Sequence, residues 1–138
     1  MPILKAEEVT VAMIDHAVGF ANLFRSHNVA EHVNITIALA KTAVVFDLPV
    51  VVTNGADTDP TGPLFAGLKE VLGDREVVVR EGNFDAFATE RFAEAVAATG
   101  RRKLLLSGLM TEGCVLQTAL SGLERGVRRP CRGRRRRR

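Results

Sequence analysis

The sequence predicts an α/β fold of the doubly wound (Rossmann-like) class, a three-layer α/β/α arrangement around a mainly parallel sheet. Short runs of β-branched and other apolar residues alternate along the chain with longer segments of helical periodicity. These runs are continuously apolar, which is typical of strands buried on both faces. At 138 residues the chain has room for one domain.

Four strands and four helices follow from this pattern. The strands are expected at residues 9–15, 49–53, 76–80 and 103–108. The helices are expected at residues 31–47, 64–73, 86–100 and 111–126. In the first helix, apolar residues recur at helical spacing at Val33, Ile37, Ala40 and Val44. Pro49 follows this helix and limits its end, and Thr111 is expected to cap the last helix.

The basic charge of the chain is confined to its end. The net charge is +3, but residues 128–138 contain eight arginines, so residues 1–127 carry −5. An arginine run can be a nucleic-acid-binding arm or a localisation signal, or a disordered tail without a selected role. It lacks interleaved aromatic residues, so we expect at most nonspecific contact with nucleic acid.

The remaining composition is that of a globular protein. Hydrophobic residues make up 46% and charged residues 25% of the chain. No apolar run has the length of a membrane span, and the N-terminus lacks the pattern of a signal peptide. We therefore expect a cytoplasmic location and no membrane partner. The two cysteines, Cys114 and Cys131, give no disulfide framework.

Three residues with reactive or charged side chains are expected to meet at one edge of the sheet. Asp15 ends the first predicted strand, Arg80 ends the third, and Cys114 follows the fourth at the start of a helix. Ligands of open α/β sheets bind at the carboxyl ends of the strands. The helix dipole would favour the thiolate of Cys114, Asp15 could accept the thiol proton, and Arg80 could hold Asp15 ionised.

A plainer interpretation of the same residues remains open. A lone cysteine on a helix is most often a small buried hydrophobe. An aspartate that ends a strand is often a turn or cap residue, and Arg80 could be a surface cation.

Four segments together resemble one known family. They are VAMIDHAVGF (residues 11–20), PTGPLFAGLKE (60–70), REGNFDAF (80–87) and SGLMTEGCVLQTAL (107–120). In this order and spacing they look like the isochorismatase-like cysteine hydrolase superfamily, and its YcaC-like branch in particular. The resemblance covers roughly residues 9–127.

The resemblance implies a catalytic triad of Asp, Lys and Cys. Asp15 matches the aspartate and Cys114 the nucleophile, whereas Arg80 occupies the lysine position and departs from the family pattern. Arginine keeps the positive charge but does not readily release a proton. The family also implies a cis peptide bond at Leu109–Met110, with the backbone N–H groups of Met110 and Cys114 forming an oxyanion hole.

The implied activity is hydrolysis of a small amide or related carbonyl substrate through a thioester on Cys114, without a cofactor. The predicted substrate pocket contains His16, Asn54, Asn83, Phe84 and Thr111, with further contributions from the loop at residues 54–63. His16, His27 and His32 lack the spacing of the metal-binding cluster found in nicotinamidases of the superfamily, so no metal is expected. His27 and His32 are expected at the surface.

Two parts of the chain are therefore expected: an isochorismatase-like hydrolase domain at residues 1–127 and a disordered arginine-rich tail at residues 128–138. Family members continue with further strands, which this tail cannot form, so the domain is expected to be incomplete. One codon choice for residues 130–137 reads Pro-Val-Val-Ala-Asp-Ala-Val one base later, which favours a frameshift near residues 128–130. We expect an exposed last strand, marginal stability and low activity.

Two interpretations of function remain. The first is a cysteine hydrolase that binds a small molecule and forms a homo-oligomer, as the family does. The second is a non-catalytic or inactive chain of the same fold that serves in assembly or binding. The reactivity of the Cys114 thiol distinguishes them.

Overall fold

The computed structural model describes residues 3–126 and contains a four-stranded parallel sheet. The strands are β1 (Val9–Ile14), β2 (Val50–Asn54), β3 (Val77–Val79) and β4 (Lys103–Gly108), in the spatial order β3-β2-β1-β4. The register places Ile14 of β1 opposite Thr53 of β2 and Gly108 of β4. The predicted strands are thus confirmed, with small differences at their ends.

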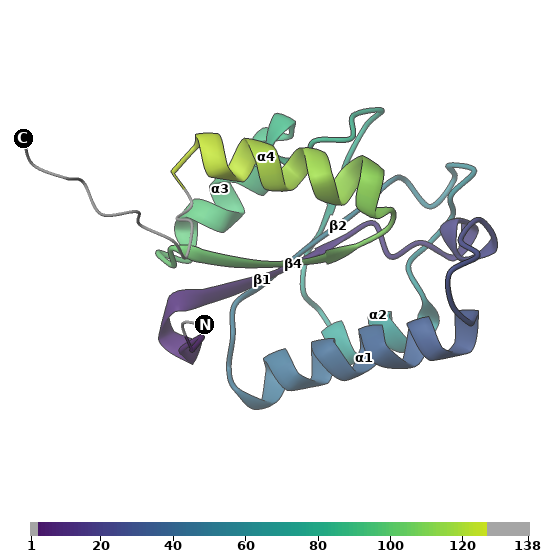
Figure 1. Ribbon diagram of the computed structural model, residues 1–138, viewed down its shortest axis with the longest axis horizontal. Helices are drawn as coiled ribbons and strands as arrows, with labels where there is room; N and C mark the ends of the chain where they lie inside the picture. Colours follow the sequence, from purple (N-terminus) through teal and green to yellow (C-terminus); the bar gives the residue numbers. More distant parts are fainter. Residues whose placement is uncertain (1–2, 127–138) are drawn as a thin grey trace, which may run out of the picture.

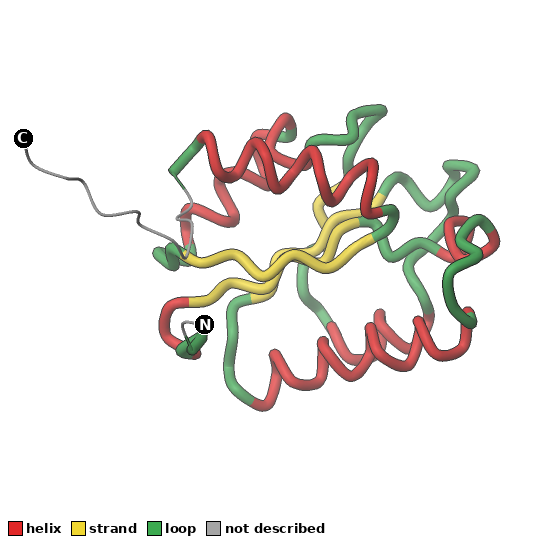
Figure 2. The backbone as a smooth tube through the Cα atoms, viewed as in Figure 1, coloured by secondary structure: helices red, strands yellow, loops and turns green. Residues whose placement is uncertain are grey.

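Helices cover both faces of the sheet, as Figure 1 and the tube in Figure 2 show. α1 (Val29–Val45) and α2 (Ala66–Leu72) lie on one face, and α3 (Glu90–Ala98) and α4 (Leu116–Glu124) lie on the other. The chain moves outward from β1 to β2 and β3, and then crosses to the other side of β1 to form β4. The strand order therefore reverses between β1 and β4, which is where open α/β sheets bind ligands.

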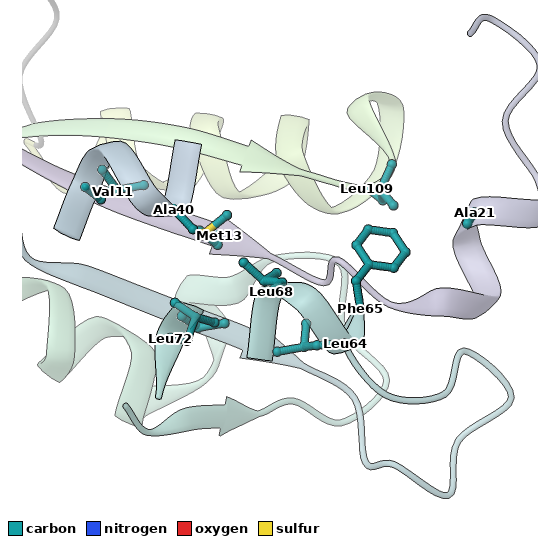
Figure 3. Close-up of a cluster of buried hydrophobic side chains, with 11 residues drawn as sticks. Val11, Met13, Ala21, Ala40, Leu64, Phe65, Leu68, Leu72 and Leu109 are labelled. Carbon is teal, nitrogen blue, oxygen red and sulfur yellow. The ribbon is translucent and has the colours of Figure 1, made fainter. Parts of the chain in front are cut away.

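β1 is the centre of the core, because successive side chains of a strand point to opposite faces. Val11 and Met13 pack toward α1 and α2 with Leu68 and Leu72, as Figure 3 shows. Ala12 and Ile14 pack toward the other face, in a cluster that also contains Phe87, Phe92 and Val96. The strand is thus buried on both faces, as its continuous apolar run predicts.

Three details of the helices differ from the sequence-based prediction. α1 begins two residues earlier than expected, at Val29, because the Asn28 side chain accepts a hydrogen bond from the Ala30 N–H (2.8 Å). Its buried residues are Thr36, Ala40 and Ala43, whereas Val44 is 44% exposed. The predicted helix at residues 86–100 is interrupted at Thr89, before α3 begins.

β4 lies at the edge of the sheet among the described residues. It pairs with β1 alone, and all six of its residues are partly exposed. This agrees with the expectation of an exposed last strand. The predicted arginine-rich tail and Cys131 lie outside the described residues. Among residues 3–126, no helix combines the length and apolar character needed to cross a membrane.

Candidate active site

Asp15 lies directly after β1, at the point where the strand order reverses. Its φ angle is 51°, in the left-handed region that Asp tolerates better than most residues. The side chain is buried, and both carboxylate oxygens are hydrogen-bonded. Oδ1 accepts a bond from the Thr53 hydroxyl (2.8 Å), and Oδ2 accepts one from Arg80 Nη2 (2.6 Å). These two bonds fix the orientation of the carboxylate.

Arg80 follows β3 and reaches across the carboxyl ends of the strands. Its backbone N–H donates to the Asn54 carbonyl (2.8 Å), which extends the β2–β3 pairing by one residue. The side chain is only 6% exposed. Its Nη2 atom donates to Asp15 Oδ2 and lies 3.4 Å from Cys114 Sγ. One guanidinium nitrogen therefore joins the carboxylate and the thiol.

Cys114 lies in a single wide helical turn (Thr111–Val115) that precedes α4. The turn is irregular at Gly113, whose φ and ψ angles of −103° and −106° are not helical. Thr111, which was expected to cap the helix, makes no capping bond, because Met110 is the residue that precedes the turn. The turn places Cys114 in the core cluster of the α3–α4 face, with its sulfur atom next to Arg80.

The environment of Cys114 favours the protonated thiol. The thiol pKa is raised to about 11, and burial is the largest cause of this rise. The Asp15 carboxylate contributes to the rise as a hydrogen-bond partner and as a negative charge, and Arg80 opposes it. Burial and Asp15 thus oppose the stabilisation of the thiolate that the position near a helix start predicts, and that prediction stays untested. The Asp15 carboxylate is a nearby candidate acceptor for the thiol proton.

Two adjoining hollows open onto Cys114, with volumes of about 340 and 460 Å³. Phe20 and Phe84 line both of them, together with Cys114. The first hollow is also lined by Asp15, Arg80, Gly55, Asp59, Pro60, Thr61, Gly82 and Asn83. The second is also lined by Leu23, Met110, Glu112, Gly113 and Gln117. The reactive group thus faces a space large enough for a small molecule.

Three residues predicted to form the pocket lie in neither hollow: His16, Asn54 and Thr111. The His16 ring is buried on the α1–α2 side and pairs through Nε2 with the Ser107 hydroxyl (2.9 Å). The Asn54 amide donates to the Gly62 carbonyl (3.0 Å) and so holds the loop that follows β2. Both residues therefore hold the segments around the site without lining the hollows. They were predicted to line the pocket because they adjoin Asp15 and Thr53 in sequence, but neighbouring side chains of an extended chain point to opposite sides.

Sequence reasoning missed residues that only the tertiary structure brings to the site. Thr53 bonds Asp15 because β2 pairs with β1 in this register. Phe20 and Leu23 come from the segment between β1 and α1; Phe20 is the last residue of a family-like segment, but neither residue was predicted to line the pocket. His32, expected at the surface, is partly buried and its ring lies 5.8 Å from that of His16, whereas His27 is exposed as expected.

Gly108, at the end of β4, is a sequence feature that indicates a close approach between β4 and β1. A Cβ atom at this position would lie 2.5 Å from the Ile14 carbonyl oxygen. Only glycine permits β4 to approach the end of β1 this closely, and this approach brings the Cys114 turn beside Asp15. The Leu109–Met110 peptide bond that follows is cis, as the resemblance implied.

The described residues contain no group of three or more His, Cys, Asp or Glu side chains that could hold a metal ion. Met110 adjoins Cys114 at the second hollow, and its backbone N–H makes no hydrogen bond to another described residue. The site thus brings together a buried thiol, a carboxylate and a fixed cation beside two hollows.

The fold and this site define the class of protein. The family model described as the isochorismatase domain matches residues 10–129. The chain therefore belongs to the isochorismatase family.

The chain is similar to proteins named YcaC. The chain is 37% identical over 123 residues to the probable hydrolase YcaC of Escherichia coli (strain K12), covering 89% of this chain and 59% of the relative. The crystal structure of the YcaC gene product of E. coli, described as an octameric hydrolase of unknown specificity, matches with a TM-score of 0.85. That match has 37% identity and covers 91% of this chain and 63% of the other.

A second solved structure is nearly as similar. YcaC from Pseudomonas aeruginosa, with hexane-2,5-diol and covalent acrylamide, matches with a TM-score of 0.84 and 36% identity. The match covers 89% of this chain and 61% of that chain. The present chain thus spans about 60% of the length of these relatives.

Proposed function

We propose that this protein is a cysteine-dependent hydrolase that acts on a small amide or related carbonyl compound through a thioester on Cys114. The observation that carries the proposal is the bond of one Arg80 nitrogen to both Asp15 Oδ2 and Cys114 Sγ, in a buried position beside the two hollows. Nucleophile, base and orienting cation are the parts that covalent catalysis requires.

The proposed first half-reaction begins with transfer of the Cys114 proton to the Asp15 carboxylate. The sulfur then forms a bond to the substrate carbonyl carbon, and the carbonyl electrons move to oxygen. The backbone N–H groups of Met110 and Cys114 stabilise this oxyanion. Collapse of the intermediate breaks the carbon–nitrogen bond, and the proton held by Asp15 passes to the leaving amine. The products are the free amine and an acyl thioester.

In the second half-reaction Asp15 acts as a base toward water. It removes a proton as the water oxygen attacks the thioester carbon, and it returns that proton to the departing sulfur. The acid product leaves and the thiol is restored. Arg80 does not exchange a proton in this scheme. It holds Asp15 in position and offsets the charge that develops on sulfur.

The raised pKa of Cys114 is compatible with this scheme because proton transfer and attack are coupled. A resting thiol is also protected from oxidation, since the thiolate is the reactive form. The Pseudomonas relative carries covalent acrylamide, an electrophile that nucleophiles attack at its alkene carbon, so it supports a reactive nucleophile in that protein and leaves the substrate class to the experiment below.

The decisive experiment measures ammonia release from a panel of small primary amides. Cys114→Ala should abolish release, and intact-protein mass spectrometry should detect an acyl adduct on the parent protein that Cys114→Ala lacks. Cys131→Ser is the matched control and should retain both signals. Equal turnover by Cys114→Ala and the parent protein would disprove the proposed nucleophile.

A non-catalytic role in assembly is the second candidate. Leu116, Leu120 and Leu123 form an exposed apolar stripe along α4, between 41% and 49% exposed. Such a stripe is typical of a surface that contacts another protein. Because the E. coli relative is octameric, we propose a homo-oligomer. An oligomer that fails to release ammonia from any amide would favour this second function.

A further inference from the structure

We propose that the site selects neutral or positively charged substrates with an apolar side and disfavours carboxylates and phosphates. This inference rests on the proposed function, in which Cys114 attacks a carbonyl group bound in the adjoining hollows. The inference is based on the charge and polarity of the residues that line the hollows. These residues come from segments that are far apart in sequence.

The lining carries an excess of negative charge. Four charged residues line the two hollows. Three are acidic, namely Asp15, Asp59 and Glu112, and one is a cation, Arg80. Arg80 and Asp15 compensate each other, with 2.6 Å between Nη2 and Oδ2 and both side chains at least nine-tenths buried. Asp59 and Glu112 remain, and neither forms an ion pair with another described residue.

The two terminal nitrogens of the Arg80 guanidinium are already engaged, whereas its Nε atom is buried without a partner among the described residues. Its Nη2 atom is directed at Asp15 and Cys114, and its Nη1 atom lies 3.4 Å from the Phe84 carbonyl oxygen. Withdrawing the guanidinium toward a substrate would leave a buried carboxylate without its partner, which is costly. An anionic substrate would therefore lose its hydration without gaining a cation.

The acidic residues belong to two different segments of the chain. Asp59 belongs to the loop after β2, where its Oδ2 atom accepts a hydrogen bond from the Ala56 N–H (3.0 Å) and so closes that loop. Glu112 lies two residues before Cys114 in the wide turn that precedes α4. Each carboxylate-bearing residue lines a hollow that Cys114 also lines, so a ligand at the sulfur shares its space with negative charge from both segments.

The remaining walls suit an apolar group. Phe20, Leu23, Phe84 and Met110 line the hollows, and aromatic faces also attract cations. Neutral hydrogen-bonding groups come from Thr61, Asn83 and Gln117. An uncharged amide with an apolar substituent, or one with a cationic substituent, fits this combination.

The test compares two alkylating reagents of similar size at Cys114. Iodoacetamide is neutral and iodoacetate is anionic. Both are used with a Cys131→Ser protein, so that Cys114 is its single thiol. Each rate is divided by the rate of the same reagent with N-acetylcysteine amide, a thiol compound without a carboxylate, which removes intrinsic differences between the reagents. The ratio of the two normalised rates also cancels the small thiolate fraction that results from the raised pKa of Cys114.

We expect the normalised ratio to favour iodoacetamide by about tenfold at low ionic strength and to fall as salt is added. Glu112→Gln and Asp59→Asn should each lower the ratio severalfold, and the Asn variant keeps the acceptor for Ala56. Glu94→Gln is the matched control, because Glu94 is exposed on α3 and lines neither hollow. It should leave the ratio unchanged.

A ratio at or below one would overturn the proposal and would mean that Arg80 is free to bind anions. A ratio that neither Glu112→Gln nor Asp59→Asn changes would also overturn it. The same holds if neither reagent modifies Cys114 in the native protein while both modify the unfolded chain, because the hollows would then admit no ligand. Alkylation needs no turnover, so these outcomes are separate from the ammonia-release test of the hydrolase.

Discussion

The neighbouring strands β1 and β4 differ sharply in their surroundings, although they are parallel and paired along six residues each. β1 has a strand on either side, and every one of its residues is buried. β4 pairs on one side among the described residues, and every one of its residues is partly exposed. The candidate site joins both, since Asp15 follows β1 and Cys114 follows β4. Asp15 is thus anchored in the core, whereas Cys114 follows the more exposed strand.

The largest effect is expected at the core side of the site. Asp15→Ala removes the partner of a cation that is only 6% exposed, and it should lower the free energy of unfolding by about 3–5 kcal/mol. Urea denaturation followed by circular dichroism measures this loss. The double variant Asp15→Ala/Arg80→Met removes both charges and should recover much of the stability. A loss below 1 kcal/mol for Asp15→Ala would show that Arg80 finds another partner.

Core truncations compare the two strands directly. Met13→Ala removes a fully buried side chain of β1 and should cost about 2–5 kcal/mol. Leu105→Ala, at a partly buried position of β4, should cost about 1 kcal/mol. Both values come from urea denaturation. Equal losses at the two positions would contradict the description of β4 as an exposed edge, and would indicate that an oligomer covers it.

Acidification should lower the folding stability through His16, whose side chain connects the end of β1 to β4. His16 follows Asp15 and pairs with Ser107 of β4, and burial lowers its pKa from 6.5 to about 4. The unfolded chain binds a proton between these two values and the folded chain does not, so folding stability is full above pH 6.5 and falls as the pH decreases toward 4. The expected loss is roughly 2–3 kcal/mol.

Thermal unfolding between pH 7 and pH 4.5 checks this window. His32, whose pKa is also lowered by burial, changes stability in the same direction. His16→Gln removes the larger contribution and should flatten the pH dependence relative to the parent protein, whereas His27→Gln, at an exposed position, is the matched control. An unchanged slope in His16→Gln would show that this buried imidazole is not the cause.

The smallest effect on folding is expected on the exposed side of α4. Leu120 is 49% exposed, so Leu120→Gln should change the free energy of unfolding by less than about 0.5 kcal/mol. Size-exclusion chromatography with light scattering would show whether the same variant reduces the molecular mass. A reduced mass with unchanged subunit stability would place this stripe in a subunit interface. A mass equal to that of the parent protein would argue against that.

Much of the fold could be predicted because it depends on local signals. Continuous apolar runs identify the four strands, and Gly73 ends α2 at the expected position with a positive φ angle. The motifs also directed attention to Asp15, Arg80 and Cys114, which the structure brings together. Their catalytic roles remain proposals that the variants above test.

The errors have a common physical origin. The inward face of α1 depends on how the helix lies on the sheet, so apolar spacing alone placed Val44 inward although it is exposed. The pKa of Cys114 depends on burial and on Asp15, which outweigh the effect of the Arg80 charge. His16 and Asn54 adjoin the site in sequence, but their side chains leave the strands on other sides.

Periodicity and composition act locally, so they were enough to predict the order of the elements, the parallel class of the sheet and the three side chains at the strand ends. Which atoms meet depends on the packing of the whole domain. The β1–β2 register brings Thr53 to Asp15, and the close approach of Gly108 to Ile14 brings the Cys114 turn beside them. The packing also decided the protonation of the thiol and the negative lining of the hollows, because burial and electric fields arise from residues that are distant in the chain.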